Sequence, residues 1–295
     1  MTATANKIEK YDLNELIRTV AKTELGSISN VVNKLLSMLR DQSTNAAALM
    51  QVIEADPVLA AKLLRRVNSA SYGLNRSISS IQESIVMVGF NGVKELALNM
   101  KVAKIFERGM QSVRYSRKAL WKHSLAVALL SKMIYRREFK ERGDDIYSIG
   151  LIHDIGIVAE EEVMPQAFSV MLDKTSSSMP ITAAEAETFG YDHQLIGARL
   201  CTAWKLPQDM TDVIGRHHSL PDASKPTAKL SMALFIADHY CHASGLGFEY
   251  SITKTQEDAD KICASLNIQQ KSMEVMLADI KKEIAELEST GGLFG

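Results

Sequence analysis

The chain has 295 residues, of which 46% are apolar and 23% charged, a composition ordinary for a soluble globular protein of one large or two modest domains. Its net charge of −1 disfavours a dedicated nucleic-acid binder, which usually carries a strong basic excess. The three cysteines lie too far apart for a disulfide framework or a zinc knuckle, and no apolar run is long enough for a membrane helix or a signal peptide. The sequence therefore predicts a cytoplasmic protein that makes no use of a membrane.

Helical spacing of apolar residues begins near Leu13 and continues through the first third of the chain. Ser27 and Ser29 are candidate caps for the second helix. Asp56 and Pro57 end one helix and begin the next, because proline is tolerated in the first turn of a helix. The segment 89–92, with a glycine at each end, should break a later helix. These patterns predict a series of short helices.

The second half has the same character. Between the predicted helices lie segments rich in Gly, Pro and Ser, and two helical stretches separated near Asn267 follow within 255–289. No alternating strand pattern appears in either half, so the sequence predicts an all-α fold. The predicted helices of this half are 117–137, 144–158, 184–204, 208–218 and 227–243.

Six polar side chains fall on the apolar faces of these predicted helices. Any one of them alone would be read as a hydrogen-bonded core residue, but together they would leave much buried polarity unexplained. Convergence on a shared metal would satisfy all six, and imidazole with carboxylate suits Fe, Mn, Zn or Ni. The adjacent His153 and Asp154 could serve two ions, with the carboxylate bridging them. The six residues are His123, His153, Asp154, His193, His217 and Asp238.

The chain also carries a series of longer motifs in a fixed order. They are Asp56-Pro57, Leu63–Gly73 and Ile78–Gly89 in the first half, and Leu120–Ser124, Gly150–Gly156, Asp192–Gly197, Trp204–Pro207 and His217-His218 in the second. The order of the six polar residues resembles the ligand series of the HD superfamily of metal-dependent phosphohydrolases. The wider chain, over about residues 20–245, resembles the HDOD family, the HD-related output domains of bacterial signalling proteins.

This resemblance implies two stacked helical subdomains. The polar segment 108–116, which contains Gly109, is the predicted junction, so the first subdomain is expected at 10–115 and the second, HD-domain-like, at 116–245. The resemblance also implies a regulatory or scaffolding role, in which the module binds a signalling protein partner or a small nucleotide ligand. Residues 246–295 lie outside the strong resemblance. They are read either as a helical extension that packs on the domain or as the interface of a homodimer.

The alternative is a metal-dependent phosphohydrolase that acts on a nucleotide or cyclic nucleotide. In that case Asp154 and His218 would be catalytic, with His218, turned by about 100° from His217, contacting phosphate or donating a proton. Three departures from active relatives of the HD-GYP type weaken this hypothesis. Their lysine three residues after the motif aspartate is Ile157 here, the position of their additional acidic ligand is Ala119, and their Gly-Tyr-Pro signature is absent. Nucleic-acid binding, supported only by local basic clusters, is a distant third.

Overall fold

The computed structural model describes residues 12–40, 44–69, 72–73, 75–112, 114–176, 178–247, 255–289 and 293. Within these ranges the chain forms helices and no strand, with only two isolated β-bridges, Gln111–Ser116 and Ser176–Met179. The all-α prediction is therefore confirmed. None of the described helices combines the length and apolar character needed to cross a membrane. Residues 70 and 71 of the family motifs lie outside the described ranges.

Six helices make up the first half: α1 (Leu13–Val20), α2 (Glu24–Arg40), α3 (Ala46–Glu54), α4 (Pro57–Val67), α5 (Ile81–Val88) and α6 (Phe90–Phe106). The Asp56-Pro57 prediction is confirmed, because Asp56 Oδ1 accepts a hydrogen bond from Leu59 N at 3.0 Å and proline opens α4. The break at Gly89 is also confirmed, since this residue has a φ of 90° between α5 and α6. The cap predicted at Ser27 or Ser29 is wrong, because α2 already begins at Glu24.

Ten helices follow: α7 (Arg117–Glu138), α8 (Asp144–Ile152), α9 (Ile155–Val163), α10 (Pro165–Lys174), α11 (Ile181–Phe189), α12 (His193–Ala203), α13 (Gln208–Ile214), α14 (Ala228–Ala243), α15 (Gln256–Ser265) and α16 (Gln270–Ser289). The separation near Asn267 is confirmed, since this residue adopts the left-handed conformation between α15 and α16 with a φ of 56°.

The structure corrects three of the predicted helices in this half and adds one. The helix predicted over 144–158 is two helices, α8 and α9, with a break at His153 and Asp154. The helix predicted over 184–204 is interrupted at Gly190, whose φ of 89° ends α11. The helix predicted over 208–218 ends at Ile214, and α10 was not predicted. Buried apolar residues lie in the helices that flank each break, so the spacing alone does not reveal the breaks.

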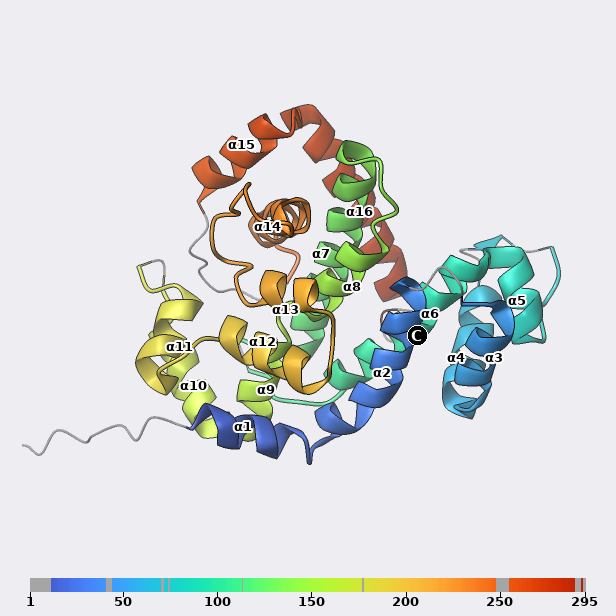
Figure 1. The fold of residues 1–295 in the computed structure, drawn as a ribbon, viewed down its shortest axis with the longest axis horizontal. Coiled ribbons are helices and arrows are strands. Elements are labelled where there is room, and N and C mark those ends of the chain that lie inside the picture. The colour runs from blue at the N-terminus through green and yellow to red at the C-terminus, as the bar shows by residue number, and fades with distance from the viewer. Residues whose placement is uncertain are drawn as a thin grey trace, which may run out of the picture.

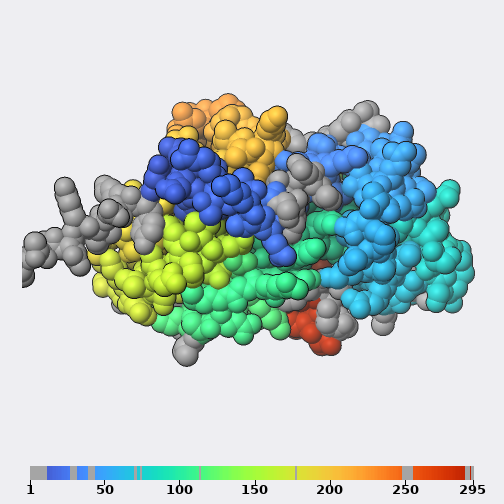
Figure 2. Space-filling view, turned by 90° about the horizontal axis from the view of Figure 1, so that it is seen from below, coloured from blue at the N-terminus to red at the C-terminus, as the bar shows by residue number. Residues whose placement is uncertain are grey.

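The helices form a main body with a smaller lobe at one end (Figure 1). The lobe contains α3, α4 and α5, and α6 runs from it into the main body, where α7 packs against α8 and α14. The first helix, α1, lies across the main body in contact with α9 and α12 (Figure 2). The last two helices run over the outside of the main body, with α15 against α14 and α16 against α7.

Candidate metal centre

All six predicted ligand residues are buried, and the fold brings them together in two adjoining groups. In each group the candidate ligand atoms lie within 4.8 Å of one another. His218, which the sequence suggested as a substrate contact or proton donor, also falls in one of the groups. The first group contains His123, His153 and Asp238; the second contains Asp154, His193, His217 and His218.

The histidines of the first group turn their Nε2 atoms toward the centre. His123 Nδ1 lies 2.9 Å from the carbonyl oxygen of Leu246, and His153 Nδ1 lies 2.9 Å from that of Gly150. Because a carbonyl can only accept, each Nδ1 is the protonated nitrogen, and this tautomer can keep the Nε2 lone pair for a ligand bond. Asp238 Oδ1 lies 2.9 Å from His123 Nε2 and 3.8 Å from His153 Nε2.

The second group is arranged in the same way. His217 Nδ1 lies 2.7 Å from the carbonyl oxygen of Ile214, and His193 Nδ1 lies 2.8 Å from Glu185 Oε2. His193 Nε2 is 3.3 Å from His217 Nε2 and 3.0 Å from His218 Nε2. Three imidazole nitrogens this close together form a donor set suited to a divalent cation.

His218 does not turn away from His217 as an ideal helix would require. Helix α13 ends at Ile214, so the two histidines lie in the turn that follows, where the rotation of 100° per residue no longer applies. Their ring centroids are 4.2 Å apart, and the side chain of Gln194 accepts the backbone N–H of His218 at 2.9 Å. Both imidazoles therefore reach the same buried space.

Asp154 lies between the two groups. Its Oδ2 is 3.1 Å from His153 Nε2, and its Oδ1 is 3.3 Å from His217 Nε2. Both carboxylate oxygens and His153 Nε2 are buried, and none has a hydrogen bond of acceptable geometry to any described residue. Buried polar atoms left without a partner are costly. A divalent cation would satisfy all three, so the residues present fit a metal centre.

The break between α8 and α9 is what places Asp154 there. This residue has a φ of −95° and a ψ of 16°, outside the helical run, and both of its neighbouring helices are buried. Gly156, in the first turn of α9, allows the close approach of α12: a Cβ at this position would lie 2.1 Å from the carbonyl oxygen of His193. Gly156 thus lets the backbone of His193 lie against α9, the helix that follows Asp154.

Glu185 was not identified from the sequence, although it supports the site. It accepts hydrogen bonds from both the backbone N–H of His193, at 3.0 Å, and Nδ1 of the same residue. A carboxylate behind a ligating histidine fixes the tautomer and increases the basicity of the ring. One signal was available, because Glu185 lies four residues after Ile181 and four before Phe189, on the buried face of α11.

Replacing Glu185 with glutamine is expected to weaken metal binding by about 10- to 100-fold, the usual effect of removing such a support. The amide preserves the size of the side chain but removes its charge. The affinity can be measured by competition with a coloured chelator. Glu187→Gln is the matched control, because Glu187 lies on the same helix with its side chain 53% exposed and pairs with Lys174. Equal affinities for the two variants would contradict the supporting role of Glu185.

The buried charges shift one another's pKa values in the metal-free protein. Burial alone would raise the pKa of Asp154, but His153, His217 and His193 hold it well below its usual range. Burial alone would lower the pKa of His193, but Glu185 and Asp154 outweigh burial and raise it to about 9. Burial, helped by His153 and His193, lowers the pKa of His217 to about 4. The protonation of each of these three side chains therefore depends on the charges of its neighbours.

The metal-free protein is expected to lose stability as pH rises from about 6.5 to about 9. His193 keeps its proton up to about pH 9 in the folded state but releases it near pH 6.5 when unfolded. Its contribution to the free energy of unfolding is therefore full below pH 6.5 and is lost as the pH rises to about 9. The loss should be of the order of 3 kcal/mol at most. Burial and Glu185 raise the pKa of Glu160, which acts in the same direction. Urea unfolding in the presence of a chelator measures the effect. Glu185→Gln should flatten the profile, and a stability that rises over this range would contradict the assignment.

Comparison with known proteins identifies the fold family. Residues 25–220 match the HDOD domain family. An uncharacterised protein of Treponema pallidum is 27% identical over 209 residues, which cover 68% of this chain and 39% of that protein. The chain thus spans well under half the length of the curated relatives it matches.

Solved structures show the same fold. An HDOD domain protein from Geobacter sulfurreducens is 24% identical, with a TM-score of 0.73 over 93% of this chain and 95% of that chain. A candidate signal transduction protein from Marinobacter aquaeolei is 15% identical, with a TM-score of 0.75 over 98% of this chain and 67% of that chain. Since the family match extends over residues 25–220 of 295, the chain belongs to the HDOD family.

Proposed function

We propose that this chain is a regulatory HDOD module that holds two divalent ions in its interior and passes a signal to a partner protein. The observation that carries the proposal is the pair of buried ligand groups joined by Asp154. The mixture of imidazole and carboxylate donors favours Fe, Mn, Zn or Ni over Ca or Mg. The proposal of a signalling role is also supported by the Marinobacter relative, which is assigned to signal transduction.

Each group supplies its own donors to an ion. His123, His153 and Asp238 would hold the first, and His193, His217 and His218 the second, with Asp154 shared between them. Bound ions of this kind can hold helices together, and in enzymes they lower the pKa of water and neutralise phosphoryl charge. The residues come from α7, α12, α14 and the segments that follow α8 and α13, so ion binding would stabilise the packing of the main body.

Two features favour regulation over hydrolysis. The candidate ligands are all closed off from solvent, and His218, the most exposed of them, is only 8% exposed. Catalytic metal sites keep a coordination position open to water or substrate, and a substrate could reach this buried space only if part of the chain moved. The position of the lysine in active HD-GYP relatives is occupied by Ile157, which is fully buried and cannot place a cation beside a phosphate.

The second candidate function is a metal-dependent phosphohydrolase acting on a nucleotide or cyclic nucleotide. It is favoured by the complete ligand series. Asp154 and His218 would then be the catalytic residues, and His218 Nδ1, 3.6 Å from Asp238 Oδ2, could donate a proton to a leaving group. Access for such a substrate would require the segment after α13 to move.

Elemental analysis of the purified full chain, followed by a hydrolysis assay, tests the proposal. We expect bound transition metal in the wild-type protein, less in His153→Ala, and no loss in His239→Ala. His239 is a matched control because it is also buried, directly follows Asp238 in the chain, and lies in neither ligand group; its Nε2 is 3.0 Å from Gln256 Oε1.

The hydrolysis assay separates the two functions. With Mn- or Fe-loaded protein, the regulatory proposal predicts that cleavage of bis-p-nitrophenyl phosphate and of cyclic dinucleotides stays at the level of the Asp154→Ala variant. Cleavage that is well above this level and disappears in the variant would establish the phosphohydrolase instead. Absence of bound metal in a folded wild-type protein would contradict both.

Three further proposals complete this picture. We propose that the two subdomains are 10–115 and 116–245 and that 246–295 is an extension. The packing of α16 against α7 supports the extension, and a homodimer interface is the alternative. We propose a signalling protein or a small nucleotide as the partner. We also propose a cytoplasmic location, which suits the three buried free cysteines.

A further inference from the structure

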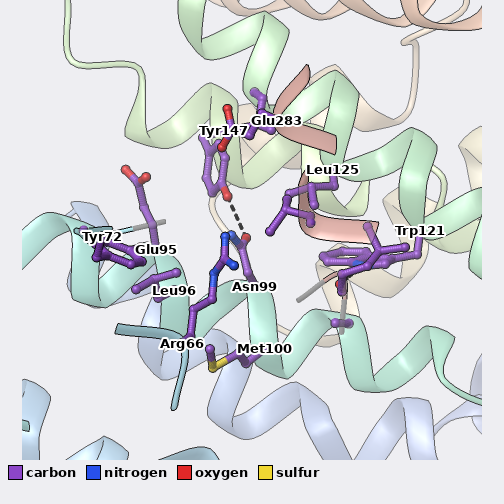
Figure 3. Close-up of a pocket in the computed structure, with 15 residues that line it drawn as sticks. Arg66, Tyr72, Glu95, Leu96, Asn99, Met100, Trp121, Leu125, Tyr147 and Glu283 are labelled. Carbon is purple, nitrogen blue, oxygen red and sulfur yellow. Dashed lines mark hydrogen bonds between the residues drawn. The ribbon is translucent and has the colours of Figure 1, made fainter. Parts of the chain in front are cut away.

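A second candidate site lies where the first half, the main body and the C-terminal helix meet. It is a cavity of about 170 Å³, lined by side chains of α4, α6, α7, α8 and α16 (Figure 3). None of its lining residues belongs to the two ligand groups of the metal centre. The cavity is therefore a separate feature of the fold, and neither proposed function uses it.

Helix α7 separates the cavity from the metal centre. Trp121, Leu125 and Leu129 line the cavity and follow one another at intervals of four residues, so they share one face of the helix. His123 is two residues from Trp121, a rotation of about 200°, and therefore faces the opposite side. An occupant of the cavity would touch the same helix that supplies a candidate metal ligand.

One end of the cavity offers hydrogen-bond donors. The guanidinium of Arg66 points into it (Figure 3) and has no hydrogen bond or ion pair within 4.0 Å to a described residue. Asn99 Oδ1 accepts a hydrogen bond from the hydroxyl of Tyr147 at 2.7 Å, which leaves the amide N–H groups of Asn99 to donate. A guanidinium and an amide donor in one half-buried space suit a carboxylate or phosphate.

Neither carboxylate that lines the cavity forms an ion pair with Arg66, although the charge of Arg66 partly offsets the burial that raises the pKa of Glu283. Glu95 pairs with Lys132, which is not among the residues that line the cavity. Glu283, on α16 at the edge of the cavity, is exposed and makes no ion pair with Arg66. The guanidinium thus remains the group best placed to receive an anion from outside the chain.

The opposite end is apolar. Trp121 donates its only N–H to the carbonyl oxygen of Leu293 at 2.6 Å, so its ring can offer only an apolar surface to the cavity. Leu125 and Leu287 extend this surface. A volume of about 170 Å³ is close to that of cavities known to hold one benzene ring, about 150 Å³. The space therefore suits one ring with a small charged group.

We propose that this cavity binds a small organic anion, made of one aromatic or similarly sized apolar ring and a carboxylate or phosphate group. The anionic group would lie against Arg66 and Asn99, and the ring against Trp121 and Leu125. Because the site is separate from the metal centre, the proposal holds whether or not the regulatory function and the ions are confirmed. If both are confirmed, the contact with α7 makes this cavity the place where a small molecule would be sensed.

The test uses the full chain with Trp204→Phe, which leaves Trp121 as the sole tryptophan of the two in the sequence. Benzoate, phenyl phosphate and neutral benzyl alcohol are titrated while Trp121 fluorescence is followed, with calorimetry as a second readout. We expect saturable binding of at least one anion in the millimolar range or tighter, and binding of benzyl alcohol weaker by about tenfold or more. Preference between the two anions then identifies the charged group.

Three variants locate the binding. Arg66→Gln should weaken anion binding by about tenfold or more, because a hydrogen bond to a charged group is lost. Arg65→Gln, at the exposed neighbouring position, should leave it unchanged. Leu96→Phe, which would fill the cavity from α6, should abolish anion binding. The circular dichroism spectrum of this variant should match that of the wild-type protein, which would show that the helical fold is kept. No saturable binding of either anion, or binding that Arg66→Gln and Leu96→Phe do not alter, would overturn the proposal. If phenyl phosphate bound at the metal centre instead, neither Arg66→Gln nor Leu96→Phe would weaken its binding.

Discussion

On the proposal that the protein binds two ions, replacing Asp154 with asparagine is expected to remove both of them. The two carboxylate oxygens face different ligand groups, with Oδ2 3.1 Å from His153 Nε2 and Oδ1 3.3 Å from His217 Nε2. An amide keeps one oxygen donor but loses the negative charge and the second oxygen, so it cannot bridge two cations. Elemental analysis of metal-loaded, desalted protein measures the number of ions per chain.

Single histidine variants provide the comparison. His153→Ala removes a donor from the first group alone, and His217→Ala removes one from the second group alone, so each is expected to lose one ion and keep the other. Circular dichroism should show the helical fold in all three variants. An Asp154→Asn protein that retains the full complement of ions would show that the carboxylate does not bridge. Loss of both ions in His217→Ala would show a single shared site.

Much of the candidate site could be predicted from the sequence because polar residues on apolar helix faces are conspicuous. His123 and Asp238 lie within α7 and α14, where the apolar residues around them are buried, and a polar side chain there needs a partner. One cap could be predicted for the same local reason: Asp56 Oδ1 accepts the backbone N–H of Leu59 at 3.0 Å, and α4 begins at Pro57. Local chemistry fixed both features.

Other features of the site depend on packing and could not be predicted from spacing. The break at His153 and Asp154 has apolar residues on both sides, because both α8 and α9 are buried, so their spacing does not show that one helix ends and another begins. His218 enters the site because α13 ends at Ile214. A helix that continued through residue 218 would have turned His218 away from His217. Glu160 lies in a run of three glutamates that suggests a solvated surface, yet it is fully buried. In each case the tertiary environment overrides the local pattern.

The two halves of the chain are joined by a buried arginine at the start of α7. Arg117 is 8% exposed, and its Nη1 donates to the carbonyl oxygen of Ile105, near the end of α6, at 3.1 Å. Its Nε forms an ion pair with Glu161 on α9, and Nη2 lies 3.2 Å from Glu162 Oε2. Glu161 also accepts the backbone N–H of Met110 at 2.7 Å. This one cation therefore connects α6, the linking segment and α9.

Replacing Arg117 with methionine is expected to lower the free energy of unfolding by about 3–5 kcal/mol, as for other buried ion pairs that lose one partner. The change preserves much of the apolar stem but leaves the carboxylate of Glu161, which is 5% exposed, without its cation. Equilibrium unfolding in urea measures the loss. Lys118→Met, at the exposed next position, is the control and should change stability by less than about 0.5 kcal/mol.

Since Arg117 lies six residues before His123 on the same helix, metal content should be measured in parallel. Weaker metal binding in a folded Arg117→Met protein would show that the junction of the two halves helps to position the metal centre, whereas a loss of stability below about 1 kcal/mol would show that the ion pair is not essential to that junction.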